Sequence, residues 1–389
     1  MNSPQPTNGQ PRGPLDGLLV ADLSRVLAGP YCTMLLADLG ATVIKVESPA
    51  GDETRTWMPP EKDGVSTYYL SINRNKRSIV LDFSKPDDVE VCRELLRRAD
   101  IAVENFKVGG LDKFGLGYDA AHEINPALIY ASISGFGTKE GAALPGYDLV
   151  VQAVSGLMSL TGAADGPAYR AGIAAFDVMT GLHATIGILA ALHHRTVTGE
   201  GQHVEVNLLA SAMSGLVNHT AAFTLAGVVA KRMGNEHPSV YPYQMMPTKD
   251  RDVIITAAND RQFRSLCKVL GIAEVADDPR FALNADRTAN RDQLHPILLE
   301  RLSHWSADDL FVQLNAAGVP CGPINSIQEG VELAEHLGLE PRVTVGEGDR
   351  AVDVVRNPID FSSSKPRYQL PPPVLGEHTD EIREWLNNK

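Results

Sequence analysis

Short apolar runs alternate with amphipathic stretches over the first third of the chain. Buried strands are predicted at 18–23, 41–46, 77–82, 101–104 and 128–134. Helical periodicity lies between them, at 31–39, 87–98 and 118–123. This alternation predicts a parallel sheet with helices on both faces, so the predicted fold class is α/β.

The rest of the chain has a different pattern. Residues 182–225 are predicted to be mostly helical, interrupted by a turn at 198–201. Two antiparallel strands are predicted at 243–248 and 253–257. Charged helices follow at 261–270, 291–303 and 307–317, then a strand at 352–355 and a last helix at 380–386.

Length and composition suggest two domains. A chain of 389 residues exceeds the usual size of a single hydrophobic core. Composition changes near 233–238, so we expect a large domain over 15–224, completed by 326–389, and a smaller α+β domain over 225–325. Residues 1–14 are polar and rich in Pro, Gly, Asn and Gln, which predicts a disordered tail.

Charge and cysteine usage narrow the class of protein. The net charge of −13 disfavours nucleic acid as a partner. The four cysteines are far apart and form no C-x-x-C pair, so we expect buried, reduced thiols and no zinc site. The sequence has no run of about eighteen apolar residues, so no membrane span is predicted. The polar start is not expected to be a signal peptide. A cytoplasmic enzyme is expected.

The common nucleotide motifs are missing. The first strand is followed by Ser24–Pro30, which has one glycine and no G-x-G-x-x-G. Gly135-Phe136-Gly137 is not followed directly by a helical pattern. A dinucleotide site of the usual kind is therefore disfavoured. No phosphate-binding loop, G-x-S-x-G or H-E-x-x-H is present either.

Asp177 is the main candidate for chemistry. It is the only charge between Arg170 and His183, and small or apolar residues surround it just before a helical pattern. One interpretation is a helix N-cap, whose carboxylate accepts backbone N–H bonds. The other is an oxygen nucleophile that is poorly solvated. The two are compatible, because the positive end of a helix favours an anion.

Seven short phrases accompany Asp177 in a fixed order. They are Ser24–Pro30, Gly40–Glu47, Asn73–Ser78 with Leu81-Asp82, Val103–Phe106 with Gly115–Tyr118, Gly135–Gly137, Gly146–Asp148 with Gln152, and Thr198–Gln202. Over residues 15–385 this set resembles the class III coenzyme A transferases, also called the CaiB/BaiF family. That superfamily includes formyl-CoA transferase, L-carnitine CoA-transferase and α-methylacyl-CoA racemase.

The resemblance implies a fold and a reaction. The expected fold has a Rossmann-like large domain and a small domain, with two chains interlocked as a homodimer. Asp177 matches the family nucleophile, which passes through an aspartyl anhydride and an aspartyl-CoA thioester. Acyl-CoA and a small carboxylic acid are the expected substrates, and no metal or other cofactor is expected.

The resemblance also implies a set of coenzyme A contacts. They are Arg25, Val26, Leu27, Ala28, Ser48, Leu81, Asp82, Phe83, Ser84, Asn105, Phe106, Lys107, Lys113, Tyr147 and Asp148. Ser48 stands where relatives often have Arg. One phosphate contact is therefore either missing or supplied by Arg55.

Departures from individual branches narrow the expected activity. Leu27 stands where formyl-CoA:oxalate transferases have Gln, and 237–244 lacks their run of glycines, so oxalate specificity is not expected. Tyr147 replaces the histidine base of the racemase branch, and tyrosine is a poor base near neutral pH. Transferases that use succinyl-CoA with glutarate, malate or mesaconate are similar at Gly234–Pro238, Tyr243-Gln244 and Ala258–Asp260.

Alternatives remain at two levels. His237 and Arg264 either hold a distal carboxylate of the acceptor or are a loop hydrogen bond and a surface charge. For the protein as a whole, the leading hypothesis is a CoA-transferase. The second is an isomerase that uses Asp177 to remove an α-proton, and the third is a non-catalytic acyl-CoA-binding dimer.

Overall fold

The computed structural model describes residues 13–388, so the predicted tail lies almost wholly outside the described residues. The described chain divides into two compact units. Unit 1 comprises 13–157, 170–229 and 340–388, and unit 2 comprises 158–169 and 230–339. The long stretch of unit 2, 230–339, begins and ends later than the predicted 225–325. Unit 2 also includes 158–169, which the sequence pattern placed in the large domain.

The segment 158–169 belongs with unit 2 because it is hydrogen-bonded to the start of the 230–339 stretch. The Gly234 N–H donates to the Gly162 carbonyl at 3.0 Å. A β-carbon at Gly162 would lie 3.2 Å from the side chain of Arg232. Such pairings between distant segments leave no local pattern in the sequence.

Unit 1 is built on a six-stranded sheet. Its strands are β1 (Leu19–Asp22), β2 (Thr42–Glu47), β5 (Lys76–Val80), β6 (Ile101–Glu104), β7 (Ile129–Ser134) and β8 (His203–Asn207). The order is β5-β2-β1-β6-β7-β8, and every neighbouring pair is parallel. This is the strand order of a doubly wound sheet, and the predicted α/β class is confirmed.

Helices cover both faces of this sheet because its strands are apolar on both sides. Val20, Val43 and Ile101 face α1 (Ala28–Asp38) and α7 (Ala175–Thr198). Their sequence neighbours Ala21 and Ile44 face the opposite way. That second face packs against α3 (Pro86–Arg98), α4 (Tyr118–Ile124) and α15 (Thr379–Asn387).

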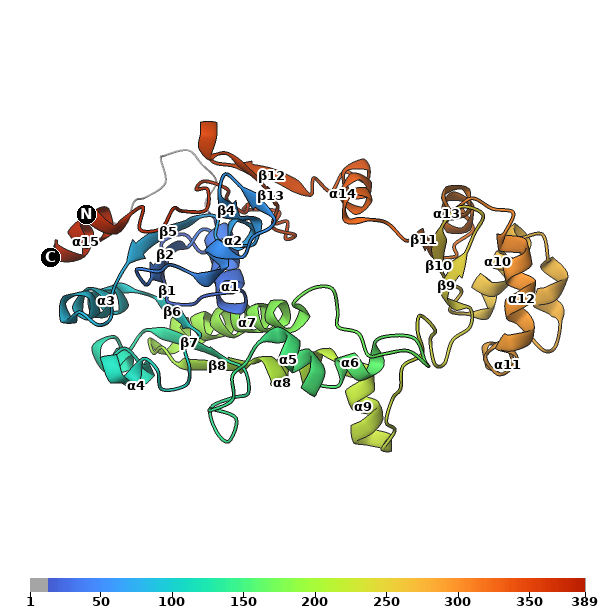
Figure 1. Cartoon of the computed structure of the whole chain (residues 1–389), viewed down its shortest axis with the longest axis horizontal. Coiled ribbons are helices and arrows are strands. Elements are labelled where there is room, and N and C mark those ends of the chain that lie inside the picture. Colours follow the sequence, from blue (N-terminus) through green and yellow to red (C-terminus); the bar gives the residue numbers. More distant parts are fainter. Residues whose placement is uncertain (1–12, 389) are drawn as a thin grey trace. The chain divides into compact units, whose positions relative to one another are not determined.

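The end of the chain completes unit 1. Figure 1 shows α15 beside α3 and β5, which lie far from it in the sequence. The guanidinium of Arg98 donates to the carbonyls of Trp385 and Leu386 at 3.0 and 2.8 Å. The Asn75 N–H donates to the Leu370 carbonyl at 2.8 Å. A two-stranded ribbon, β12 (Arg342–Val345) with β13 (Val352–Val355), precedes this return.

Shorter elements of unit 1 connect the main layers. They are η1 (Glu53–Thr56), β3 (Glu61–Lys62), β4 (Val65–Ser66), α2 (Thr67–Ile72), η2 (Asp112–Phe114), α5 (Asp148–Val154), α8 (Leu208–Gly215), α9 (Val217–Ala226) and η4 (Gly348–Arg350). The short helix α6 (Leu157–Leu160) begins at the boundary with unit 2.

Unit 2 has a small antiparallel sheet with helices. Strand β10 (Asp252–Thr256) pairs with β9 (Tyr243–Pro247) and β11 (Cys321–Pro323). The predicted antiparallel pair is therefore confirmed. The helices are α10 (Asp260–Val269), η3 (Ala273–Asp277), α11 (Asn284–Ala289), α12 (Arg291–Leu302), α13 (Ala307–Ala316) and α14 (Ile327–His336).

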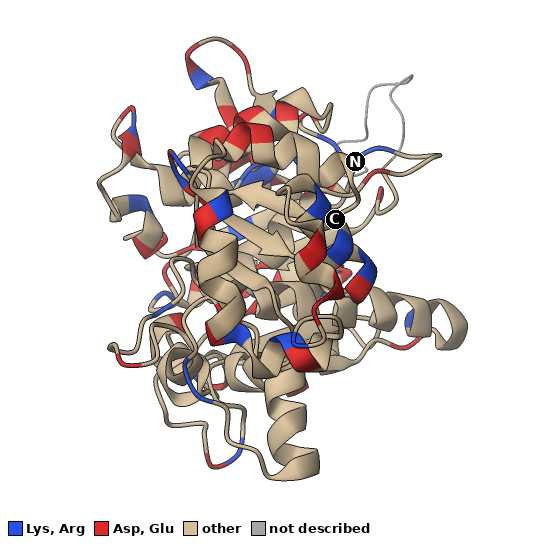
Figure 2. Cartoon of the chain, turned by 90° about the vertical axis from the view of Figure 1, so that its right-hand side faces the viewer, with Lys and Arg blue, Asp and Glu red and all other residues tan. Residues whose placement is uncertain are grey.

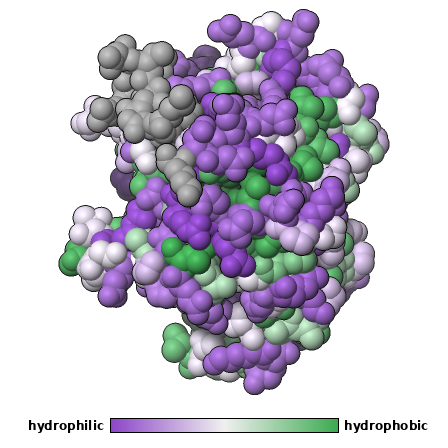
Figure 3. Space-filling model, turned by 90° about the vertical axis from the view of Figure 1, so that its left-hand side faces the viewer, coloured by the Kyte–Doolittle hydropathy of each residue, from purple (hydrophilic) through white to green (hydrophobic). Residues whose placement is uncertain are grey.

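Helix α7 is long and apolar enough to cross a membrane by length and composition alone, which the sequence analysis did not anticipate. In unit 1 it packs against α1, β7 and β8, with Phe176, Ala184 and Ile188 fully buried. Figure 2 shows acidic and basic residues interspersed along the ribbon. The face drawn in Figure 3 is largely hydrophilic, with apolar residues in small separate groups.

Candidate active site

The site is built where the connections of the sheet diverge. The chain leaves β1 for β2 on one side, whereas β6 lies on the other, so the loops after β1 and β6 meet at the carboxyl ends of the strands. Asn105 joins them. Its Oδ1 accepts from the Arg25 N–H at 2.9 Å, and its Nδ2 donates to the Arg25 carbonyl at 2.7 Å.

Buried charges support the loop after β1. Lys45 Nζ donates to the Ser24 carbonyl and pairs with Asp52, both at 2.9 Å. Lys76 Nζ donates to Asp22 Oδ2 at 3.0 Å and to the Pro30 carbonyl at 2.9 Å. Burial acts to raise the pKa of the Asp22 carboxyl, but the two lysines, together with hydrogen bonds from Ser24 and Thr33, hold that pKa below its usual value. These carboxylates are therefore structural.

The loop itself is held in a restricted conformation. Val26 has a φ of 68°, which a β-branched residue adopts only when its surroundings enforce it. Helix α7 approaches the same loop closely at Gly181. A β-carbon there would lie 2.7 Å from the Ala28 carbonyl oxygen, so glycine is required for this contact.

Asp177 lies in the first turn of α7, where its side chain makes no capping hydrogen bond to the helix. The cap comes from Asp148, the first residue of α5. Asp148 Oδ1 accepts from the N–H groups of Phe176 and Asp177, at 2.7 and 3.1 Å. The N-cap interpretation of Asp177 is therefore wrong, because a carboxylate from a distant segment occupies that position.

Gln152 fixes the capping carboxylate. Its Nε2 donates to Asp148 Oδ2 at 2.5 Å and to the Ile173 carbonyl at 3.0 Å. Its Oε1 accepts from the Ala171 N–H at 2.8 Å. The segment that leads into α7 is thus bound to α5 before the helix begins, and the Asp177 carboxyl is left free for chemistry.

Partial burial raises the pKa of the Asp177 carboxyl to about 7, and the nearby negative charge of Asp148 adds to the effect. Leu27, Tyr68, Ala174 and Val178 pack together around this turn of the helix. No cation among the described residues contributes to the shift. When ionised, a carboxylate in this setting is a stronger base than an ordinary carboxylate, and is suited to attack an acyl carbon.

A cavity of about 500 Å³ opens beside Asp177. Nine of the predicted site residues line it: Arg25, Val26, Leu27, Ala28, Asn105, Phe106, Lys107, Tyr147 and Asp177. These residues come from four separate segments, and the structure brings them together. Asp148 does not line the cavity; it accepts hydrogen bonds from the N–H groups at the start of α7.

Besides Asp148, six predicted contacts do not line this cavity. They are Ser48, Leu81, Asp82, Phe83, Ser84 and Lys113. Leu81 is buried in the core, and Asp82 accepts from the Ser84 N–H and hydroxyl, at 3.0 and 2.7 Å. The Phe83 ring lies 5.5 Å from the ring of Phe114, which follows Lys113 in the sequence.

Arg55, the other candidate for a phosphate contact, is bound to residues of unit 1. Its guanidinium donates to both oxygens of Glu47, at 2.9 and 2.7 Å, and to the Tyr69 hydroxyl and the Pro373 carbonyl. The side chain is thus held by neighbours within unit 1, and a phosphate contact from Arg55 stays a prediction. Ser48 itself is exposed.

Sequence reasoning missed Tyr68 as a site residue. Burial raises the pKa of its hydroxyl to about 12, and the negative charges of Asp177 and Asp148 contribute. Tyr68 begins no recognisable motif, and it reaches Asp177 only because α2 packs on α1. No local signal could have identified it.

The remaining candidates, His237 and Arg264, lie in unit 2. His237 Nδ1 accepts from the Ser239 N–H at 3.1 Å, and its ring lies 5.0 Å from that of Tyr243. Arg264 is exposed on α10. His237 thus makes a hydrogen bond within its loop, and Arg264 is a surface charge. In the described part of the chain, no three His, Cys, Asp or Glu side chains are grouped as a metal site.

Comparisons with known proteins identify the family of this chain. Residues 15–379 match the model of CoA-transferase family III. The chain is 43% identical over 378 residues to a succinate–glutarate CoA-transferase of Agrobacterium fabrum, covering 95% of this chain and 94% of that protein. It is 42% identical to the human succinyl-CoA:glutarate CoA-transferase, covering 95% of this chain and 85% of that protein.

A solved structure shares the fold along the same length. The CAIB/BAIF family protein from Brucella suis is 43% identical and aligns with a TM-score of 0.87, covering 96% of this chain and all of that one. The likeness extends through both units rather than being limited to the sheet. The chain belongs to CoA-transferase family III and is a CoA-transferase.

Proposed function

We propose that the protein transfers coenzyme A from succinyl-CoA to a dicarboxylic acid such as glutarate, with Asp177 as the covalent nucleophile. The observation that carries the proposal is the Asp177 carboxyl, uncapped and unpaired, beside a cavity lined by the loops after β1 and β6. The substrates are those named for the bacterial and human relatives.

The first half-reaction removes succinate. An Asp177 oxygen attacks the thioester carbon of succinyl-CoA, the C–S bond breaks, and the CoA thiolate leaves with the electron pair. The thiolate then attacks the Asp177 carbonyl of the mixed anhydride, which releases succinate and leaves an aspartyl-CoA thioester. Placing the carboxylate and the thiolate in one cavity favours both steps.

The second half-reaction repeats these steps in reverse order. A carboxylate of the acceptor attacks the aspartyl thioester and expels the thiolate, which forms a second anhydride. The thiolate then attacks the acceptor carbonyl of that anhydride, giving the new acyl-CoA and restoring the Asp177 carboxylate. One thioester is exchanged for another, and no proton or electron is consumed.

An exchange assay by mass spectrometry in deuterium oxide tests this proposal. Purified protein is mixed with succinyl-CoA and, in turn, with glutarate, malate, mesaconate or oxalate. Formation of a new acyl-CoA that needs both substrates is the expected result. A parallel sample contains a branched acyl-CoA in place of succinyl-CoA. Deuterium in its α-position, without any new acyl-CoA in either sample, would assign the protein to the isomerase branch instead.

The covalent step has its own test. Intact-mass analysis after mixing with succinyl-CoA alone should show an adduct of one CoA less one water on the wild type. Asp177→Asn should show no such adduct. Asp87→Asn, which removes an exposed carboxylate from the first turn of α3, is the matched control and should retain it.

We further propose that the protein is a homodimer, as the family resemblance implies. Large apolar side chains are exposed on α7 and α9, among them Ile186 (62% exposed) and Leu225 (86% exposed). Exposed apolar surface of this kind is typical of protein interfaces. Light scattering after size-exclusion chromatography should give a mass of two chains, and a stable monomer would refute this part of the proposal.

A further inference from the structure

Glu53 is a charged residue of the cavity at Asp177 that takes no part in the proposed chemistry. It lines the cavity together with Arg25, whose guanidinium donates to Glu53 Oε1 at 3.0 Å. Both side chains are partly exposed, Arg25 by 58% and Glu53 by 35%. Arg25 is one of the coenzyme A contacts that the family resemblance implies. In this structure, a carboxylate of the same chain is already bound to it.

The position of Glu53 is set by the residue before it. Asp52 caps the short helix η1, where its Oδ1 accepts from the N–H and the hydroxyl of Thr54, at 3.0 and 2.7 Å. The Asp52 N–H donates to Glu47 Oε2 at 3.0 Å. Glu53 is the first residue of this capped helix, so the fold places its carboxylate at the cavity wall.

The backbone at Arg25 is held as firmly. Asn105 binds both its N–H and its carbonyl, at 2.9 and 2.7 Å. The carbonyl of the preceding residue, Ser24, accepts from Lys45 Nζ at 2.9 Å. Lys45 Nζ also lies 2.9 Å from Asp52 Oδ2, and both of these side chains are buried. A buried ion pair thus connects the two backbone segments that present the exposed ion pair.

Glu53 and the phosphates of an acyl-CoA are alternative partners for Arg25. A guanidinium recognises a carboxylate or a phosphate through the same planar set of N–H groups. An exposed ion pair contributes little to stability, so Arg25 can exchange one anion for the other with little loss. The carboxylate that is left then repels the phosphates within the same cavity. Both the exchange and the repulsion lower the affinity for coenzyme A.

We propose that Glu53 lowers the affinity of the site for coenzyme A, because its carboxylate competes with the phosphates for Arg25. A CoA-transferase releases an acyl-CoA at the end of each turnover, and weaker binding shortens the time for which this product stays bound. Glu53 thereby favours the exchange of acyl-CoA over its retention. This inference rests on the proposed binding of acyl-CoA at the cavity that contains Asp177.

The test is a double-mutant cycle of Glu53→Gln and Arg25→Gln, which isolates the interaction between the two side chains. Glutamine keeps the length of the glutamate side chain and removes its charge. The dissociation constant of free CoA is measured by titration calorimetry for the wild type, the two single variants and the double variant. KM and kcat for succinyl-CoA are measured on the same proteins.

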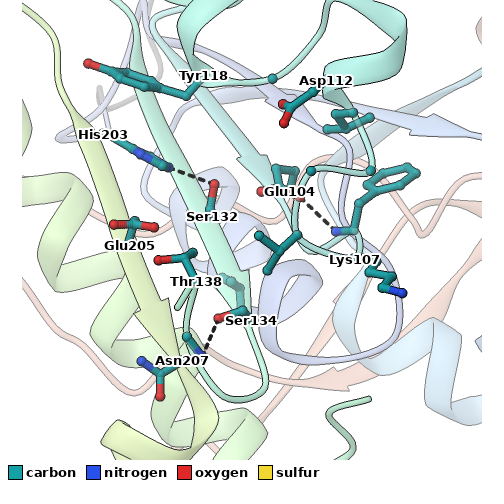
Figure 4. A pocket seen from close by; sticks show the side chains of 18 of the residues that line it. Glu104, Lys107, Asp112, Tyr118, Ser132, Ser134, Thr138, His203, Glu205 and Asn207 are labelled. Atoms are coloured by element: carbon teal, nitrogen blue, oxygen red, sulfur yellow. Dashed lines mark hydrogen bonds between the residues drawn. The ribbon is translucent and has the colours of Figure 1, made fainter. Parts of the chain in front are cut away.

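Glu205→Gln is the matched control. Glu205, on β8, lines a second cavity of about 590 Å³, which shares the segment 106–108 with the cavity at Asp177. Figure 4 shows Glu205 among the polar side chains of this second cavity. The variant makes the same change of charge within unit 1, but Glu205 does not line the cavity that contains Arg25. It therefore measures how one negative charge fewer affects the binding of any anion.

Glu53→Gln should bind CoA about 2- to 5-fold more tightly than the wild type, the effect expected of an exposed ion pair, and KM for succinyl-CoA should fall with it. Arg25→Gln should weaken binding about 3- to 10-fold. In the Arg25→Gln background, Glu53→Gln should lose most of its effect. Succinyl-pantetheine, which has no phosphates, should show the same KM in Glu53→Gln and in the wild type.

Three outcomes would overturn the inference. They are unchanged or weaker CoA binding by Glu53→Gln, an equal gain of affinity in Glu205→Gln, and a full gain from Glu53→Gln in the Arg25→Gln background. A wild type that binds CoA without transferring it would refute the proposed function alone, since the dissociation constants would still decide this inference. A wild type that does not bind CoA would refute both.

Discussion

Asp22 and Asp177 are carboxyl groups of the same unit, both withdrawn from water, and they differ in their partners. Asp22 is fully buried, and Lys76 and Lys45 hold its pKa below the usual value. Asp177 has a carboxylate for a neighbour, and its pKa is raised to about 7. Burial with a cation makes a carboxylate inert and structural, whereas burial beside an anion makes it reactive.

The largest expected effect comes from removing the reactive carboxylate. Asp177→Asn should lower the rate of transfer by at least roughly 1,000-fold, because the amide is not a competent nucleophile. Steady-state assays of acyl-CoA exchange measure this loss. Near-normal turnover in the variant would show that another group performs the chemistry.

The same variant should be more stable than the wild type at pH 8. The pKa of Asp177 is raised on folding, so ionisation of this carboxyl between about pH 4 and pH 7 disfavours the folded state. The amide avoids this cost above pH 7, and the melting temperatures should converge below about pH 4. Thermal denaturation over this pH range also shows that lost activity is not lost folding.

The structural counterpart is Lys76→Met. It leaves Asp22 buried without its nearest cation, and should destabilise the protein by about 3–5 kcal/mol. Urea unfolding measures the difference. Lys85→Met removes an exposed lysine, 67% exposed and 3.8 Å from Asp82, and should cost no more than about 0.5 kcal/mol. Equal effects of the two would contradict the contrast between the two carboxylates.

The pH profile of the wild type should report the ionisation of Asp177. Only the carboxylate attacks the thioester, so kcat/KM should rise with pH and level off above pH 7. With a pKa of about 7, the value at pH 6 should be about one tenth of that at pH 8. A profile that is flat from pH 5 to pH 8 would show that the free enzyme keeps this carboxyl ionised.

The smallest effect is expected from Asp148→Asn. The amide oxygen can still accept from the Phe176 and Asp177 N–H groups, but the charge that raises the pKa of Asp177 is gone. The midpoint of the pH profile should therefore move to lower pH. Asp148→Ala also removes the cap of α7, and should cost about 1–2 kcal/mol in stability. An unchanged midpoint in the asparagine variant would leave burial as the sole cause of the shift.

The sheet could be predicted from the sequence because its strands are short apolar runs between helices. Five of the six strands were expected, and 101–104 and 129–134 agree almost to the residue. Strand β8 was missed, since 182–225 was interpreted as mostly helical. Its sequence, His-Val-Glu-Val-Asn, alternates polar and apolar residues, and this was the signal that should have identified it.

The site was predictable in composition but not in geometry. Residues Arg25–Ala28 and Asn105–Lys107 follow two of the predicted strands, and they do meet beside Asp177. The roles of Asp148 as a cap and of Arg55 as a partner of Glu47 depend on contacts between segments far apart in the chain. Such contacts leave no trace in local sequence.

The discontinuity of unit 1 has a consequence for how the protein is made. Its sheet is complete once residue 207 has left the ribosome, yet Arg98 and Asn75 find their partners only in residues 370–386. Most of unit 2 is a contiguous stretch synthesised in between. During translation, the sheet face that α15 covers in the finished protein therefore stays exposed until unit 2 and the C-terminal segment have been synthesised. A nascent chain stalled before residue 370 should bind chaperones and be cleaved readily by proteases, although Asp177 has long since been synthesised.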